Sequence, residues 1–168
     1  VEERGERDMS GILAVLEAGH KLSAETLAAA QDLGAQLGLP VHSVEPTFVY
    51  TADDFTEALS ELIHAMQFQI VLFPHTYQVR DFAPKLATRF DRALISDVIR
   101  MRVDGGKLVA TRQLFQGKLN AEIRPLGEPV FVSLQAGAYR AAATSDVIVE
   151  TLAAPSSASR QRPEEKFR

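Results

Sequence analysis

The chain has 168 residues, of which 46% are hydrophobic, enough for one domain with a substantial core. A net charge of −4 gives no basic surface for nucleic acid or an anionic membrane, and the lack of cysteine excludes disulfides and thiolate metal sites. The apolar runs are shorter than the ~20 residues that cross a bilayer, and the mixed charges of residues 1–11 are unlike a signal peptide, so we expect a cytoplasmic protein.

The first part of the chain predicts alternating strands and helices. Residues 11–17 form a short apolar run of strand length. Apolar positions 26, 30, 33 and 37 recur at helical spacing, which predicts a helix over residues 24–37 with Ser23 as its N-cap. Two short strands, 41–44 and 48–50, are expected next, separated by Glu45-Pro46-Thr47.

A second helix and a buried strand precede the stretch of greatest interest. Thr51-Ala52-Asp53-Asp54 is typical of a capped helix start, and apolar residues continue at helical spacing to Met66. Residues 70–73 predict a central buried strand. The next helix, over residues 82–90, is expected to open at Arg80-Asp81, which places Pro84 in its first turn.

After Arg92 the pattern changes to alternating strands. Residues 97–103 and 107–115 flank the turn signal Asp104-Gly105-Gly106, and two further strands are expected over 119–124 and 129–134. We therefore predict an α/β fold: three-layer, Rossmann-like, mostly parallel, with an antiparallel hairpin at the edge. Residues 1–10 are interpreted as an N-terminal extension, 11–152 as the domain and 153–168 as a linker or tail.

The turn after the central strand has the position of a ligand site, because ligands of open α/β sheets bind at the carboxyl ends of strands. A phosphate loop needs glycine, however, and residues 73–87 contain none. An anion at Arg80 and the helix start remains an alternative, but Asp81 as a helix cap and Arg80 as a surface or interface charge are favoured over it.

Catalytic and metal patterns are absent from the sequence. The four histidines show no metal-binding spacing, and no GxSxG motif occurs. His75 is the only histidine at a plausible site, and a hydrolase or lyase that uses it with Asp81 has little support. Ser96-Asp97 has no histidine near it in sequence, and Asp97 is expected to accept hydrogen bonds from backbone or arginine. We predict no catalytic residues and no metal.

Four colinear stretches resemble the N-terminal domain of the electron transfer flavoprotein alpha subunit. They are GHKLSAETLAAAQDLGAQLG, VLFPHTYQVRDFAPKLATRFDRALISDV, GGKLVATRQLFQGKLNAEI and PVFVSLQAGAYR, and they cover roughly residues 11–140. The most specific correspondences are Leu72, Thr76 and the helix start Arg80-Asp81-x-Ala83-Pro84-x-Leu86-Ala87, followed by Leu94-Ile95-Ser96-Asp97.

The resemblance implies an electron carrier and not an enzyme. Such alpha subunits pair with a beta subunit and carry electrons from acyl-CoA dehydrogenases (fatty acid beta-oxidation) or other flavin dehydrogenases to a membrane quinone oxidoreductase. FAD is held mainly by the alpha subunit's C-terminal domain, so no cofactor is expected on this chain alone, and AMP commonly occupies the beta subunit. The N-terminal domain and the beta subunit support the flavin domain.

One departure from the family pattern concerns the turn itself. Members usually have glycine before the arginine, and this chain has Val79, whose β-branched side chain disfavours a positive φ. We therefore predict that the turn is a protein joint, with Thr76, Arg80 and Asp81 facing the beta subunit or the flavin domain. The alternative is a nucleotide-binding protein of the universal-stress type that binds ATP or AMP.

Overall fold

The computed structural model describes residues 11–141 and 148–157. The expected N-terminal extension (1–10) and residues 158–168 of the expected linker lie outside the described residues. In chain order the elements are β1 (Ile12–Val15), α1 (Leu22–Leu37), β2 (Val41–Pro46), α2 (Ala52–Met66), β3 (Ile70–Pro74), α3 (Tyr77–Arg89), β4 (Leu94–Asp104), β5 (Lys107–Leu114), β6 (Leu119–Ile123), β7 (Val130–Leu134) and β8 (Val149–Leu152).

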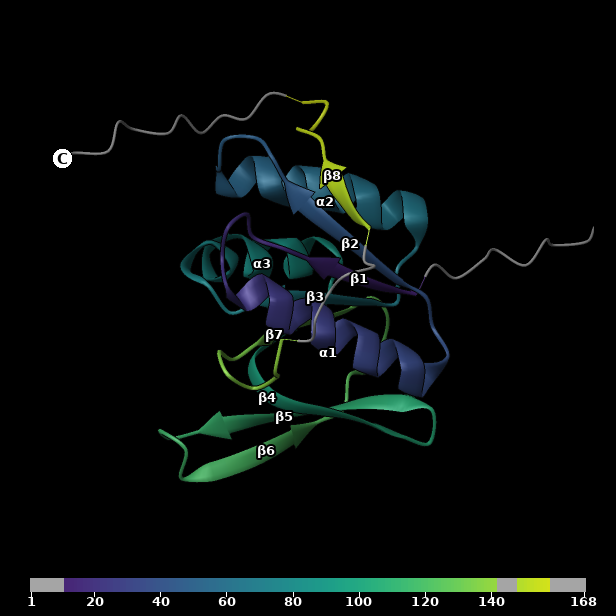
Figure 1. Ribbon diagram of the computed structural model, residues 1–168, viewed down its shortest axis with the longest axis vertical. Helices are drawn as coiled ribbons and strands as arrows, with labels where there is room; N and C mark the ends of the chain where they lie inside the picture. The colour runs from purple at the N-terminus through teal and green to yellow at the C-terminus, as the bar shows by residue number, and fades with distance from the viewer. Residues whose placement is uncertain (1–10, 142–147, 158–168) are drawn as a thin grey trace, which may run out of the picture.

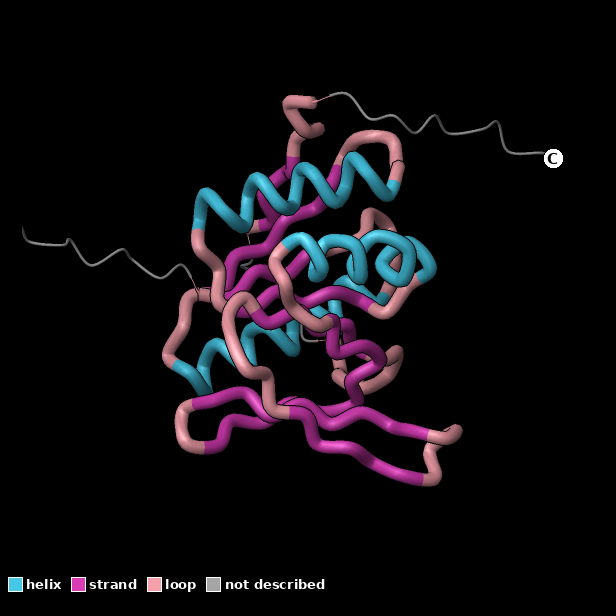
Figure 2. Tube along the Cα trace, turned by 180° about the vertical axis from the view of Figure 1, so that it is seen from behind, coloured by secondary structure: helices cyan, strands magenta, loops and turns pink. Residues whose placement is uncertain are grey.

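The strands form one sheet in the order β6-β5-β4-β7-β3-β1-β2-β8. Strands β4, β7, β3, β1, β2 and β8 pair in parallel, whereas β4–β5 and β5–β6 are antiparallel. Figures 1 and 2 show β5 and β6 at the end of the sheet opposite β8, beyond the three helices. The predicted fold class, mostly parallel with an antiparallel hairpin at the edge, is confirmed.

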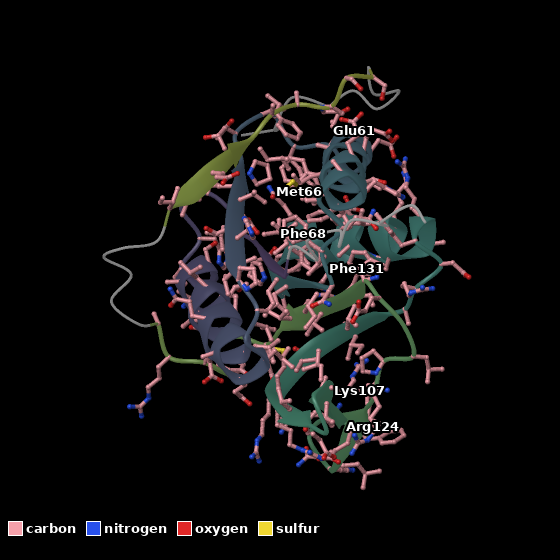
Figure 3. All side chains as sticks on the ribbon, turned by 90° about the vertical axis from the view of Figure 1, so that its right-hand side faces the viewer. Glu61, Met66, Phe68, Lys107, Arg124 and Phe131 are labelled. Carbon is pink, nitrogen blue, oxygen red and sulfur yellow. The ribbon has the colours of Figure 1, made fainter. Side chains whose placement is uncertain are left out.

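Helices cover both faces of the parallel strands, which explains the continuous apolar runs in the sequence. Successive side chains of a strand point to opposite faces. In β3, Val71 and Phe73 pack with α2 and α3 in one core cluster, while Ile70 and Leu72 pack with α1 in the other. In Figure 3 the side chain of Phe131 lies in the layer between the sheet and the α2–α3 pair, and Lys107 and Arg124 lie on the distant hairpin.

Two helices begin earlier than the sequence predicts. Helix α1 begins at Leu22, and Ser23 is not its N-cap: the Ser23 hydroxyl donates to the Glu17 carbonyl and accepts from the Glu17 amide, at 2.8 and 2.9 Å. Helix α3 begins at Tyr77 because Thr76 caps it. Pro84 therefore lies inside the helix and not in its first turn. Because proline has no backbone N–H, it cannot donate a hydrogen bond to the preceding turn there.

Three strands differ from what the sequence predicts. Strand β2 continues through Pro46, and residues 48–50 are a loop whose aromatic rings pack on Phe55. Strand β4 begins at Leu94 and pairs first with β7 and then with β5, with a register shift around Asp97, where φ is +59°. Strand β8 was not predicted; it is a short edge strand whose only buried residue is Leu152.

Candidate functional site

The turn between β3 and α3 is fixed by hydrogen bonds within the chain. Thr76 has an extended backbone conformation, and its Oγ1 accepts from the Val79 amide at 3.2 Å. The Thr76 carbonyl accepts from the Arg80 amide at 3.0 Å. The donors that a free helix start would offer to an anion are thus partly used, as expected for a capped helix.

Asp81 does not cap α3, contrary to the prediction. Its carboxylate lies on the side of the helix that faces the loop after β2, where Oδ2 accepts from the Tyr50 hydroxyl at 2.6 Å. The same hydroxyl lies 3.3 Å from the Gln78 carbonyl. Burial, together with the neighbouring Asp81 and Glu17 carboxylates, raises the pKa of the Tyr50 hydroxyl above its ordinary value. Tyr50 is therefore a donor that holds α3 against this loop.

His75, Ser133 and Asp97 come together at the carboxyl ends of β3 and β7 beside the irregular part of β4. The His75 Nδ1 lies 2.9 Å from the Ser133 Oγ, and the same oxygen accepts from the Asp97 amide at 3.2 Å. The His75 Nε2 is 4.0 Å from the Asp97 carboxylate. Since the Ser133 oxygen accepts from the Asp97 amide, the Ser133 hydroxyl proton is available for the His75 Nδ1. This favours the imidazole tautomer with hydrogen on Nε2.

A serine, a histidine and an aspartate in contact invite comparison with a hydrolase triad, but this arrangement does not fit one. Ser133 is 0% exposed, so a substrate carbonyl cannot reach its oxygen. That oxygen is already an acceptor for the Asp97 amide, which stabilises the left-handed backbone at Asp97. The hydrolase alternative paired His75 with Asp81, and the structure places Asp81 on Tyr50 instead. We interpret the cluster as structural.

Acid is expected to destabilise the fold through His75. Burial lowers its pKa, Arg80 and Arg112 lower it further, and the Asp97 carboxylate opposes them without prevailing. As the pH falls below 6.5, His75 therefore binds a proton in the unfolded chain before it does so in the folded protein. The stability that neutral His75 contributes above that pH is lost. Thermal melts at pH 7.5 and 5.5 should show a smaller acid-induced fall in Tm for His75→Asn than for the wild type. Equal falls would contradict this assignment.

A groove of about 430 Å³ runs from this cluster along α3 toward the start of β4. Its lining combines apolar side chains with His75, Arg80 and Arg92, and it includes no carboxylate. The Arg92 guanidinium is engaged by the backbone carbonyls of Asp91 and Glu128. The Arg80 guanidinium lies 5.7 Å from the centre of the exposed Tyr77 ring. Both arginines are exposed, and Arg80 is the one without a backbone carbonyl partner among the contacts described.

Metal ligands do not gather in the part of the chain that the structure describes: no three His, Asp or Glu side chains there could share an ion. The remaining histidines have other contacts. His42 packs edge-on against Phe68, His64 stacks on Phe90, and His20 Nδ1 accepts from the Leu22 amide. Over residues 11–141 and 148–157, no helix has both the length and the apolar character to cross a bilayer.

A family model described as the electron transfer flavoprotein domain matches residues 7–167. The chain belongs to the electron transfer flavoprotein family. The resemblance read from the sequence, to the N-terminal domain of the alpha subunit, is confirmed. An alpha-type role within this family follows.

Curated relatives match over part of their length. The electron transfer flavoprotein alpha subunit of Syntrophomonas wolfei is 34% identical over 88 residues, 52% of this chain and 28% of that protein. The alpha subunit of Bacillus subtilis is 34% identical over 86 residues, 51% and 26% of the two chains. Protein FixB of Rhizobium meliloti is 36% identical over 110 residues, 64% and 31%. Each match spans less than a third of the relative.

The β3–α3 turn was predicted from the sequence, but the residues that contact or adjoin it were not. Of the three predicted interface residues, Thr76 is buried as the helix cap, and Arg80 and Asp81 are exposed in the first turns of α3. Tyr50, Glu17 and Ser133 were not singled out, although each lies at the same edge of the sheet. The cluster of aromatic residues at 48–50 was the available signal, and it was interpreted as a strand.

Proposed function

We propose that this chain is the N-terminal domain of an electron transfer flavoprotein alpha subunit and that it scaffolds a heterodimer with the beta subunit. In this role it supports the FAD domain that carries electrons from dehydrogenases to the respiratory chain, and the redox step belongs to the flavin. The family match over residues 7–167 is the observation that carries the proposal.

The chemistry of the β3–α3 turn supports a contact role over a cofactor role. A phosphate cradle needs bare backbone amides, usually at glycine. Here the Val79 amide is taken by Thr76, and the Val79 side chain is buried. What remains at the surface is Tyr77, 88% exposed, with Arg80 and Asp81 beside it. Tyrosine and arginine are the residue types that most often dominate protein interfaces.

The proposal is tested by expressing residues 1–168 alone and together with the cognate beta subunit. We expect a chain that is colourless alone and that co-purifies with the beta subunit at equal stoichiometry. Stoichiometric FAD on the isolated chain would contradict the division of labour, and failure to bind the beta subunit would overturn the scaffold role. Calorimetry with ATP and AMP completes the test, because micromolar binding would favour a universal-stress-type function instead.

A further inference from the structure

A small cavity of about 180 Å³ lies at the carboxyl ends of β1 and β2, next to the start of α3. Its walls come from the loop after β1, the loop after β2, and the two helices α2 and α3. The residues that matter for its chemistry are Glu17, Phe48, Tyr50, Phe55 and Gln78. None of the residues that line it is basic.

Glu17 is the unusual group of this cavity. Its Oε2 is sealed from solvent and has no hydrogen-bond partner within the described residues, while the residue as a whole is partly exposed. The hydroxyl of Tyr50, which shares the cavity, is committed to Asp81 at 2.6 Å and cannot serve Glu17 as well. A carboxylate oxygen that is closed to solvent and lacks a partner costs free energy, so its retention calls for a reason outside the isolated fold.

Aromatic rings line the same cavity as this carboxylate. Phe48 and Tyr50 each meet the ring of Phe55 edge-on, with centroids 5.0 and 4.8 Å apart. The backbone carbonyl of Gln78, near the Tyr50 hydroxyl, can only accept hydrogen bonds. Aromatic faces attract cations, and a carboxylate beside them adds charge. The Glu17 carboxylate, the Gln78 carbonyl and the aromatic faces therefore favour a donor with positive charge.

Size and surroundings identify the source of that cation. Pockets for whole small molecules measure about 300–1,000 Å³, so this cavity holds only the tip of a larger group. Two exposed side chains are next in sequence to its lining residues: Val49, 73% exposed, lies between Phe48 and Tyr50, and Tyr77, 88% exposed, precedes Gln78. A pocket beside exposed apolar and aromatic side chains is the usual setting for an interface anchor.

We infer that this cavity receives a lysine or arginine side chain of the partner subunit, with Glu17 as its counter-ion. The inference rests on the proposed heterodimer and names one of its contacts. The ammonium or guanidinium group enters among the rings of Phe48, Tyr50 and Phe55 and donates to Glu17. The Glu17 Oε2 that is unpartnered in the isolated chain is thereby satisfied on assembly.

The first test measures affinity for the beta subunit by calorimetry. Glu17→Gln should weaken binding about 30-fold or more, because it removes one member of a desolvated charge pair. Glu45→Gln makes the same change on neighbouring β2, outside the cavity lining, and should leave the affinity unchanged. If wild type and Glu17→Gln bind equally, the inference is wrong and the heterodimer stands. If the wild type does not bind, both fall.

The second test needs no partner. Titration with n-butylammonium or methylguanidinium chloride should shift the NMR amide signals of Ala18, Tyr50 and Gln78 in a saturable way. Neutral n-butanol is the matched control and should not shift these signals. Glu17→Gln should abolish the response to the cations. Isolated Glu17→Gln should also melt at a higher temperature than the wild type, since a neutral amide replaces a carboxylate with one unpaired, solvent-closed oxygen. Lower stability together with unchanged cation response would overturn the assignment.

Discussion

Replacing Phe82 with alanine is expected to lower the free energy of unfolding by about 3–5 kcal/mol, the usual cost of deleting a buried phenylalanine ring. Phe82 is 2% exposed and joins α3 to both α2 and the sheet. Its ring meets Phe55 at 5.5 Å and Phe73 at 5.8 Å, both edge-on. For a domain of this size, Tm should fall by roughly 6–20 °C, measurable by circular dichroism.

Tyr77→Ala is the matched control, because it removes an aromatic ring from the same helix at a position that is 88% exposed. Its effect on stability should stay within about 0.5 kcal/mol. A loss for Phe82→Ala below about 1.5 kcal/mol would mean that α3 repacks without this ring. That result would contradict the view that the contacts of Phe82 fix the helix in place.

The same aromatic series connects the core to the proposed anchor pocket. Phe73 lies in the sheet, Phe82 covers it from α3, Phe55 follows in α2, and Tyr50 and Phe48 border the cavity. Two ion pairs on the outer side, Lys85–Asp53 and Arg89–Glu57, also join α2 to α3. They are partly exposed and contribute little individually. Rigidity at the pocket therefore derives mainly from buried rings.

The strands that were predicted correctly are those whose surroundings leave one interpretation. Residues 12–15 and 70–74 are buried on both faces, so they are apolar at every position and are bounded by turn residues. The turn at Gly105 and Gly106 needs positive φ at two successive residues, 57° and 75°, and two adjacent glycines indicate it directly. Local sequence is sufficient in both cases.

The errors arise where a distant residue decides the outcome. Thr76 and Asp81 are both competent helix caps, and the sequence does not reveal that Asp81 bonds Tyr50, 31 residues away. His75 meets Ser133 across 58 residues, and Ser133 meets Asp97 across 36, because β7 inserts between β3 and β4. Strand β8 pairs only with β2 and exposes three of its four residues, so no apolar period indicated it.

The second large effect is expected for Ser133→Ala, which should destabilise the fold by about 1–3 kcal/mol. The Ser133 hydroxyl, itself buried, serves the Asp97 amide and the His75 ring at once, and its removal leaves both groups without that partner. The Asp97 amide belongs to a backbone held at φ +59°, which is unfavourable for a residue with a side chain. Loss of its hydrogen bond weakens the constraint that maintains this conformation.

Ser43→Ala provides the comparison that isolates this double role. Ser43 is as buried as Ser133, but its hydroxyl serves a single group, the Ile148 carbonyl at 2.8 Å. Urea unfolding should therefore show a larger loss for Ser133→Ala than for Ser43→Ala, with similar m-values. Equal losses would show that Ser133 contributes only one effective hydrogen bond. The link between β3, β7 and the irregular part of β4 would then have to come from apolar packing. In that case Asp97→Gly, which relieves the positive φ, would be the stabilising substitution at this edge.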